Sequence, residues 1–123
     1  MITGIVNADH EVTVRIQVRG PGGQDHEVET ILDTGFGGSL TLPQALIGNL
    51  NLTWRSHGTA TLANGAQEDF DVYAATVQWD GQLRPILVSA IGTIPLLGMA
   101  LLVGFDLRAR VRVGGSVEIE AIP

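Results

Sequence analysis

The residues in this chain that could do chemistry begin with Asp33, which follows the apolar pair Ile31-Leu32 and precedes Thr34-Gly35. A strand that ends at a carboxylate can hold that group at the surface, where it can take a proton from water. Two carboxylates that face one water can act together in hydrolysis, because at that range one of the two keeps a proton and the other can accept one. Gly35 is predicted to turn the chain sharply with a positive φ, because it has no Cβ. The triplet by itself is also found by chance, as a solvated aspartate at a strand-to-loop turn.

A second segment follows the first at a distance that fits one small domain. Ile94–Gly98 (apolar-Pro-apolar-apolar-Gly) ends 65 residues after Asp33 (98 − 33) and runs into the apolar Met99–Leu102. Together, the two segments resemble the retropepsin-like (clan AA) single-domain aspartic proteases, and Leu40–Pro43 is similar to the matching segment of bacterial members. The resemblance extends from about residue 12 to residue 102. It implies an all-β fold, a closed acid-protease barrel with a flap hairpin and one or two short helices.

The resemblance also assigns roles to individual residues. The Asp33 carboxylate activates the water, the Thr34 hydroxyl braces two such loops across a two-fold axis, and Gly35 presents backbone groups near the substrate. The following glycines keep the loop narrow enough for another backbone to approach, and a hairpin forms a flap over the substrate. The expected site residues are therefore Asp33, Thr34 and Gly35 for catalysis and Gly37, Ala63, Asn64 and Gly65 for substrate binding.

Only one Asp-Thr-Gly segment occurs in the chain, since Asp80 and Asp106 lack the apolar strand before them and the Thr-Gly after them. One chain therefore supplies half of a two-carboxylate site, and a homodimer with each Asp33 beside its two-fold axis supplies the whole. The expected activity is that of an aspartic endopeptidase acting on peptide or protein substrates. The alternative is a non-catalytic dimerisation or peptide-binding module with the same fold. A third interpretation, a small ligand-binding β-barrel, makes Asp33 incidental and leaves the second segment unexplained.

Three positions depart from the family pattern. Retroviral members carry an Asp four residues after the catalytic Asp and an Arg just after the glycine of the second segment, which form an ion pair near the dimer interface. Gly37 and Met99 occupy these positions, so both partners are missing together and no lone buried charge remains. Ala100 stands where members commonly carry Asp or Asn. The dimer must be held in another way, for which the C-terminal hairpin is a candidate.

The elements that position these residues are predicted from apolar–polar alternation and turn residues. Glu11–Arg19 alternates strictly, and Val28–Leu32 delivers Asp33. Ser39–Leu42 returns as a strand, and Pro43 and Gly48 are expected to open and close a helix. The later elements are an edge strand over Leu83–Ile91, a passage of Leu96-Leu97 beneath the Asp33 loop, and a short helix over Gly98–Val103.

Two hairpins are expected. Asn64-Gly65 predicts a long one with arms Gly58–Ala63 and Gln67–Trp79, whose second arm slips in apolar phase, which indicates a bulge or a change of buried face. Trp54, just before it, is interpreted as a core or barrel-edge aromatic. The second hairpin, Leu107–Ile122, is expected to turn at Gly114-Gly115-Ser116. Its expected pairs are Val113 with Val117, Arg112 with Glu118, Val111 with Ile119 and Arg110 with Glu120.

Composition limits the remaining possibilities. A net charge of −6 argues against a nucleic-acid partner, and no apolar stretch is long enough to span a membrane. The chain has no cysteine, and His26 has no second ligand at metal spacing, so neither a metal nor another cofactor is expected. One domain over residues 1–123 is expected. Because the first residues lack the features of a signal peptide, the expected location is the cytoplasm.

Overall fold

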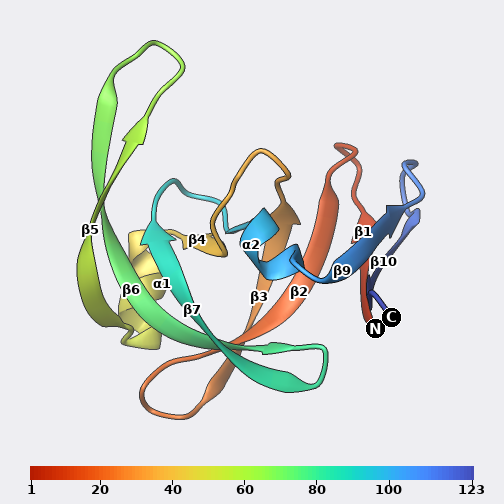
Figure 1. Cartoon of the computed structure of the whole chain (residues 1–123), viewed down its shortest axis with the longest axis horizontal. Helices are drawn as coiled ribbons and strands as arrows, with labels where there is room; N and C mark the ends of the chain where they lie inside the picture. The colour runs from red at the N-terminus through yellow and green to blue at the C-terminus, as the bar shows by residue number, and fades with distance from the viewer.

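The computed structural model describes every residue of the chain, from Met1 to Pro123, and is built mainly from β-strands (Figure 1). Six strands form a closed ring in which β6 pairs with β7 on one edge and returns to β2 on the other. The ring contains β2 (Val12–Arg19), β3 (Asp25–Leu32), β8 (Leu96–Leu97), β4 (Leu40–Leu42), β7 (Gln82–Ala90) and β6 (Gln67–Trp79).

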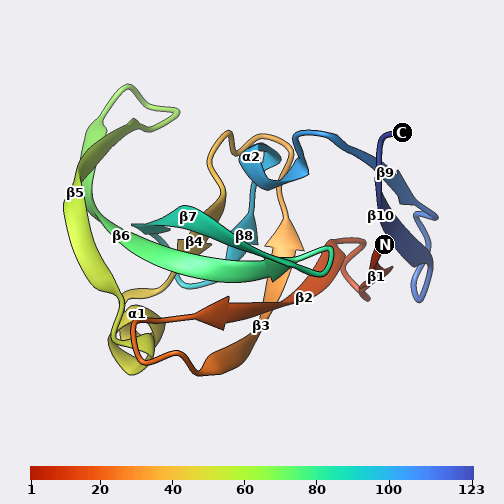
Figure 2. The ribbon, with the colours of Figure 1, turned by 60° about the horizontal axis from the view of Figure 1, so that its bottom comes forward.

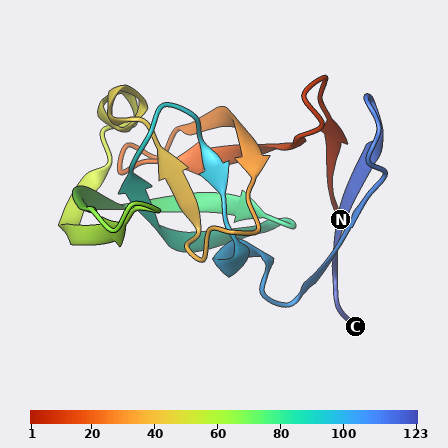
Figure 3. The ribbon, with the colours of Figure 1, turned by 90° about the horizontal axis from the view of Figure 1, so that it is seen from above.

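Four further strands extend the ring on two sides. β5 (Thr53–Thr61) pairs with β6 on one side, and β1 (Ile2–Val6), β10 (Ser116–Ala121) and β9 (Phe105–Ala109) continue from β2 on the other. Viewed from above, these three terminal strands stand apart from the ring (Figure 3). Two short helices, α1 (Gln44–Leu50) and α2 (Met99–Leu102), complete the chain. The all-β prediction with short helices is thus confirmed, although the ring is less regular than a simple barrel.

The ring closes around an apolar core supplied by the predicted alternation. On β2, Val14, Ile16 and Val18 are buried, while Arg15 between them is exposed. Residues from every other side of the ring meet them. The fully buried ones include Leu40, Leu42, Val77, Val88 and Leu97 of the ring and Leu101 of α2. The core therefore fixes the strands that carry the Asp33 loop, since β3, β4 and β8 all belong to the ring.

The long hairpin is formed by β5 and β6 and rises well clear of the body (Figures 1 and 2). At its tip the Leu62 N–H donates to the Ala66 carbonyl at 2.7 Å, and Gly65 has a φ of +84°. This is a three-residue loop ending in a left-handed glycine, rather than the two-residue turn that Asn-Gly most often makes. The Asn64 side chain accepts a hydrogen bond from the Ala66 N–H at 2.9 Å.

The predicted phase slip in β6 is a change of buried face. β6 keeps one register with β7 from Val72 to Trp79, so β6 carries no bulge against β7. The irregularity lies on β5, where Arg55 is the extra residue between Trp54 and Ser56. The side chain of Trp54, expected in the core or at a barrel edge, is half exposed, and its indole N–H donates to Asp71 Oδ1 at 3.1 Å.

Three other predictions were wrong in detail. The strand expected at an edge, β7, pairs with β6 on one side and with β4 on the other. The C-terminal hairpin pairs Glu118 with Arg108 and Ile119 with Leu107, four residues away from the expected register. Its loop spans residues 110–115 because that segment bonds to β1 as well: the Gly114 N–H donates to Val6 O at 2.9 Å. Helix α1 does not close at Gly48. It ends at Asn51, which takes the left-handed conformation with a φ of 52°.

Candidate active site

The Asp33 loop arches over the end of a strand that is paired on both edges. β8 lies between β3, with which it is parallel, and β4, with which it is antiparallel. Loop 33–39 connects β3 to β4 and therefore passes the carboxyl end of β8. The Asp33 N–H donates to Leu97 O and the Ile31 N–H to Pro95 O, each at 2.9 Å. The predicted passage of Leu96-Leu97 beneath the loop is thus observed.

The second sequence segment holds the rest of the loop through main-chain hydrogen bonds. The Gly98 N–H donates to Ser39 O at 3.0 Å, the Met99 N–H to Phe36 O at 2.8 Å, and the Ala100 N–H to Gly38 O at 3.1 Å. A Cβ on Gly98 would lie 2.1 Å from Gly38 O, which no side chain could accommodate. The two segments, far apart in sequence, therefore form one rigid unit.

Asp33 sits at the surface of this unit, half-buried, with Thr34 and Gly35 exposed beside it. Its Oδ1 accepts a hydrogen bond from the Gly35 N–H at 2.9 Å. Gly35 does not have a positive φ, so the expected reason for this glycine was wrong. Because Gly35 has no side chain, its backbone can lie close to the Asp33 carboxylate. A Cβ there would lie 3.2 Å from Asp33 Oδ1. The Thr34 hydroxyl makes no hydrogen bond within the chain and is free to bond outside it.

The glycines after the carboxylate leave main-chain groups unpaired. The N–H groups of Gly37 and Gly38 have no hydrogen-bond partner in the chain, and Gly37 is exposed. The Phe36 ring folds back over the loop, since Cβ atoms built on Gly38 and Gly98 would each lie 2.5 Å from it. Free N–H groups beside a carboxylate can pair with an extended chain, as a sheet edge does. Sequence reasoning missed Phe36, although an aromatic residue between two glycine positions was a usable signal.

The remaining predicted site residues lie in a different part of the structure. Ala63, Asn64 and Gly65 occupy the tip of the β5–β6 hairpin, and Figure 1 shows that tip standing apart from the Asp33 loop. One chain therefore brings together Asp33, Thr34, Gly35 and Gly37 but not the three tip residues. A contact between the hairpin tip and Asp33 within one chain would require the hairpin to move.

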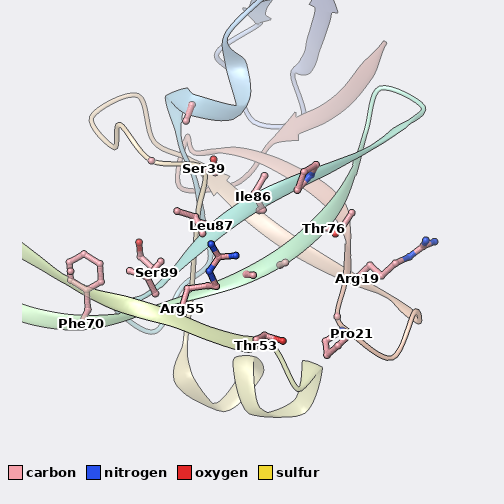
Figure 4. A pocket seen from close by; sticks show the side chains of 18 residues that line it. Arg19, Pro21, Ser39, Thr53, Arg55, Phe70, Thr76, Ile86, Leu87 and Ser89 are labelled. Atoms are coloured by element: carbon pink, nitrogen blue, oxygen red, sulfur yellow. The ribbon is translucent and has the colours of Figure 1, made fainter.

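A cavity of about 880 Å3 lies between the hairpin arms, β7 and the back of the Asp33 loop (Figure 4). Its apolar lining includes Phe70, Val72, Ile86 and Leu87, and Gly38 and Ala100 border it, whereas Asp33 does not. Arg55, the bulged residue of β5, lines the cavity and has no ion-pair partner. A bulge commonly redirects a side chain in this way.

A second arginine at the cavity has its charge satisfied. Arg19 bonds Asp25 with Nε at 2.8 Å and Nη2 at 3.2 Å. This hydrogen bond lowers the pKa of Asp25 below its usual value and raises the pKa of Arg19. Arg55 is therefore the cation of this cavity that is available to an acidic group. Neither arginine was singled out from the sequence, because the bulge that places Arg55 is a tertiary feature.

Arg84 supports α2 from β7 and was also missed. Its guanidinium donates to Leu101 O at 3.2 Å and to Ala100 O at 3.3 Å, at the end of the helix whose first N–H groups hold the Asp33 loop. A cation at this end of a helix satisfies carbonyls that have no partner within the helix. It supplies a contact to α2 in a chain where Met99 and Gly37 cannot form an ion pair.

We expect Arg84→Met to lower the free energy of unfolding by about 1–2 kcal/mol, because half-buried carbonyls lose a charged donor. Urea unfolding followed by fluorescence measures this change. Arg84→Lys is the matched control, and its free energy of unfolding should lie between those of wild type and Arg84→Met. Lysine keeps the positive charge but lacks the planar guanidinium that donates to both carbonyls. An unchanged unfolding midpoint in Arg84→Met would show that these hydrogen bonds do not support α2.

The acidic and histidine side chains of the chain are scattered over its surface. No group of three or more of them is arranged to hold a metal ion. Neither helix has the length and apolar character required to cross a bilayer.

The chain is similar in structure to a solved retroviral protease. EIAV protease complexed with the inhibitor HBY-793 matches with a TM-score of 0.58 and 22% identity, over 78% of this chain and 88% of that one. The solution structure of simian foamy virus (mac) protease matches with a TM-score of 0.49 and 17% identity, over 72% of this chain and 90% of that one. No protein-family model and no curated protein matches the chain. At 22% identity the match to EIAV protease shows the fold alone, and this chain has the retropepsin-like fold.

Proposed function

We propose that this protein is an aspartic endopeptidase that hydrolyses peptide bonds as a homodimer, of the single-domain type found in bacteria. The observation that carries the proposal is the support of Asp33: its loop is bonded at Leu97, Gly98 and Met99, while its carboxylate stays accessible. An aspartate that is merely solvated in an ordinary turn does not require a loop held by hydrogen bonds to a distant segment of the chain. The fold shared with EIAV protease is consistent with this use of the carboxylate.

The reaction follows from two Asp33 carboxyl groups that face one water and share one proton. The water oxygen attacks the carbonyl carbon of the peptide while its proton passes to the ionised carboxylate. The protonated carboxyl group donates to the carbonyl oxygen, which gives a tetrahedral intermediate with two hydroxyl groups. As the C–N bond breaks, the carboxyl group that took the water proton gives it to the leaving amine, and one hydroxyl group of the intermediate gives its proton to the other carboxylate, which restores the shared proton. The Gly35 N–H, bonded to Asp33 Oδ1 at 2.9 Å, keeps each carboxylate oriented for this exchange.

The substrate is an extended peptide. Its main chain pairs with the free N–H groups of Gly37 and Gly38, and the hairpin tip at Ala63–Gly65 closes over it. Side chains leaving the peptide toward the back of the Asp33 loop meet the cavity that Gly38 and Ala100 border. A peptide-binding module without catalysis is the second candidate, because Gly37 and Ala100 depart from the family pattern around the carboxylate.

A shared site predicts that an inactive chain inhibits the active one. Adding an equal amount of Asp33→Asn chain to a fixed amount of wild type should reduce peptide hydrolysis to about half, because random pairing leaves about a quarter of all dimers with two carboxylates. The assay uses a mixed peptide library at concentrations where wild type is dimeric. Excess mutant should drive the rate toward zero.

The alternatives predict other results. Complete sites within single chains would leave the rate unchanged on mixing. A peptide-binding module would show no hydrolysis by wild type at any concentration, while fluorescence anisotropy of labelled library peptides would still report binding. Pre-equilibration for several hours before the assay allows the subunits to exchange, and an unrelated acidic protein in place of the mutant controls for dilution.

A further inference from the structure

The cavity between the hairpin arms and β7 is positively charged in an acidic protein. The chain has a net charge of −6, yet the residues that line this cavity include two arginines and no aspartate or glutamate. One of them, Arg19, is paired with Asp25, which does not line the cavity. The other, Arg55, has no ion-pair partner. The cavity therefore presents one guanidinium without a counter-ion.

Strand alternation keeps the acidic side chains of the hairpin out of the cavity wall. Four alternate residues of β6 line the cavity: Phe70, Val72, Ala74 and Thr76. Asp69 and Asp71 alternate with them and therefore lie on the opposite face of the strand. There Asp69 accepts a hydrogen bond from Thr59, and Asp71 accepts one from Trp54, each at 3.1 Å. Neither carboxylate is placed to neutralise a cation on the cavity side.

The bulge in β5 places Arg55 on the cavity side. Arg55 is the extra residue between Trp54 and Ser56, and Ser56 pairs with Val72 of the lining face. Figure 4 shows the Arg55 side chain pointing into the cavity, toward Leu87 of β7. Leu87 is 53% exposed, so open apolar surface lies beside the charge. Such a site fits a ligand that ends in an anion on a short apolar stem.

We propose that this cavity selects peptides with a glutamate side chain, whose carboxylate pairs with Arg55; the inference rests on the proposed function and specifies its substrate. A guanidinium can donate two parallel hydrogen bonds to one carboxylate. The methylene groups of the glutamate pack on Leu87 and Val72. Glutamate has one more methylene group than aspartate, so the apolar wall favours glutamate of the two.

The selected glutamate lies away from the bond that is cleaved. Asp33 does not line the cavity, whereas Gly38, near the other end of the Asp33 loop, does. A peptide paired with the free N–H groups of Gly37 and Gly38 runs from the carboxylate toward the cavity. We therefore expect the glutamate at least one residue beyond the two that flank the cleaved bond.

Arg55→Glu tests the pairing by inverting the charge. One cleavable peptide from the mixed library is remade with Glu, Gln or Lys at each position in turn. Values of kcat/KM are measured at about pH 6, where glutamate, with an ordinary pKa of about 4.3, is ionised. Wild type should prefer Glu to Gln about five- to tenfold at one position, since an ion pair that water can reach contributes modestly. Arg55→Glu should instead prefer Lys to Gln there.

Two further variants separate Arg55 from the charge of the whole protein. Arg55→Gln should lose the preference for Glu over Gln. Arg15→Gln removes the same charge from an exposed side chain of β2 outside the cavity, and should keep the preference. Each preference is a ratio of two peptides with one variant, so a general change in activity cancels. A preference for Glu that is absent from wild type, falls beside the cleaved bond or survives in Arg55→Glu would overturn the assignment.

Binding distinguishes a failure of this inference from a failure of the proposed function. If wild type cleaves no library peptide, the same substitutions are made in the labelled peptide that it binds most tightly by fluorescence anisotropy. Tighter binding of the Glu peptide, lost in Arg55→Gln, would refute the endopeptidase and leave the glutamate site standing. Hydrolysis without any preference for Glu would overturn the glutamate site and leave the endopeptidase standing. Neither hydrolysis nor binding of any peptide would overturn both.

Discussion

Replacing Asp33 with Asn should abolish peptide hydrolysis and leave the fold intact. The amide cannot accept the proton of the attacking water, and removal of a general base lowers turnover by at least about a hundredfold to ten-thousandfold. The Asn carbonyl oxygen can still accept the hydrogen bond that the Gly35 N–H donates to Oδ1 at 2.9 Å, so the loop keeps its shape. Turnover of a mixed peptide library, with wild type and variant at equal concentration, measures the loss.

The control for this experiment is Asp9→Asn. Asp9 is an exposed aspartate in the β1–β2 turn whose carboxylate bonds to nothing in the chain, so its substitution should change neither turnover nor stability. Comparable melting temperatures for the Asp33 variant and wild type would show that lost turnover is not unfolding. Asp33→Asn protein that hydrolyses the library at the wild-type rate would rule out this carboxylate as the catalytic one.

The second large effect is expected at Gly98. An added Cβ would lie 2.1 Å from Gly38 O and 2.5 Å from Phe36 Cδ2, and both neighbours belong to the Asp33 loop. Backbone cannot give way as a flexible side chain can, so Gly98→Ala should cost roughly 3 kcal/mol of stability. It should also eliminate hydrolysis, because the loop loses the bonds that Gly98, Met99 and Ala100 donate. Urea unfolding and library turnover measure the two effects.

Gly48→Ala provides a matched control, because the same chemical change occurs where space is available. Gly48 lies inside α1, is exposed, and a Cβ there would have no atom within 4 Å. Alanine is the better helix former, so this variant should be more stable than wild type by about 0.5–1 kcal/mol. Equal, small effects at the two positions would contradict the tight contact at Gly98. The φ of −106° at Gly98 is one that alanine can adopt, so a loss there reports sterics and not backbone strain.

Local patterns in the sequence were sufficient for most of the fold. The alternation of β2, the hairpin around Asn64-Gly65 and the short helix α2 each depend on residues close to one another in the chain. The two motif segments also predicted which parts meet, since the Asp33 loop and Gly98 are bonded as expected. The positive φ expected at Gly35 was wrong. A glycine can be required either by a positive φ or by close contact with a neighbouring group, and the sequence does not distinguish these two causes.

The features that sequence reasoning missed are set by tertiary contacts. Shifting the C-terminal hairpin by four residues preserves which side chains face the core, but cross-strand charge pairing favours the expected register, because the observed one places Asp106 opposite Glu120. The choice is made by β1, which bonds to Gly114 and Gly115 and draws them into a longer loop. Likewise, the cavity at Arg55 and the support of α2 by Arg84 arise where separate strands meet. No local pattern of residues marks such positions.

The position of β8 between β3 and β4 has a consequence for the order in which the protein is made. β3 and β4 have left the ribosome long before the two residues of β8, yet the Asp33 N–H bonds to Leu97 and the loop bonds to Gly98–Ala100. Contacts between distant segments form late in folding, because the intervening chain must first be brought together. A nascent chain that carries Asp33 but not yet Leu97 therefore lacks the main-chain hydrogen bonds that hold the Asp33 loop in place. The arrangement around Asp33 can therefore form only after residues 97–100 have been made and have bonded to the loop.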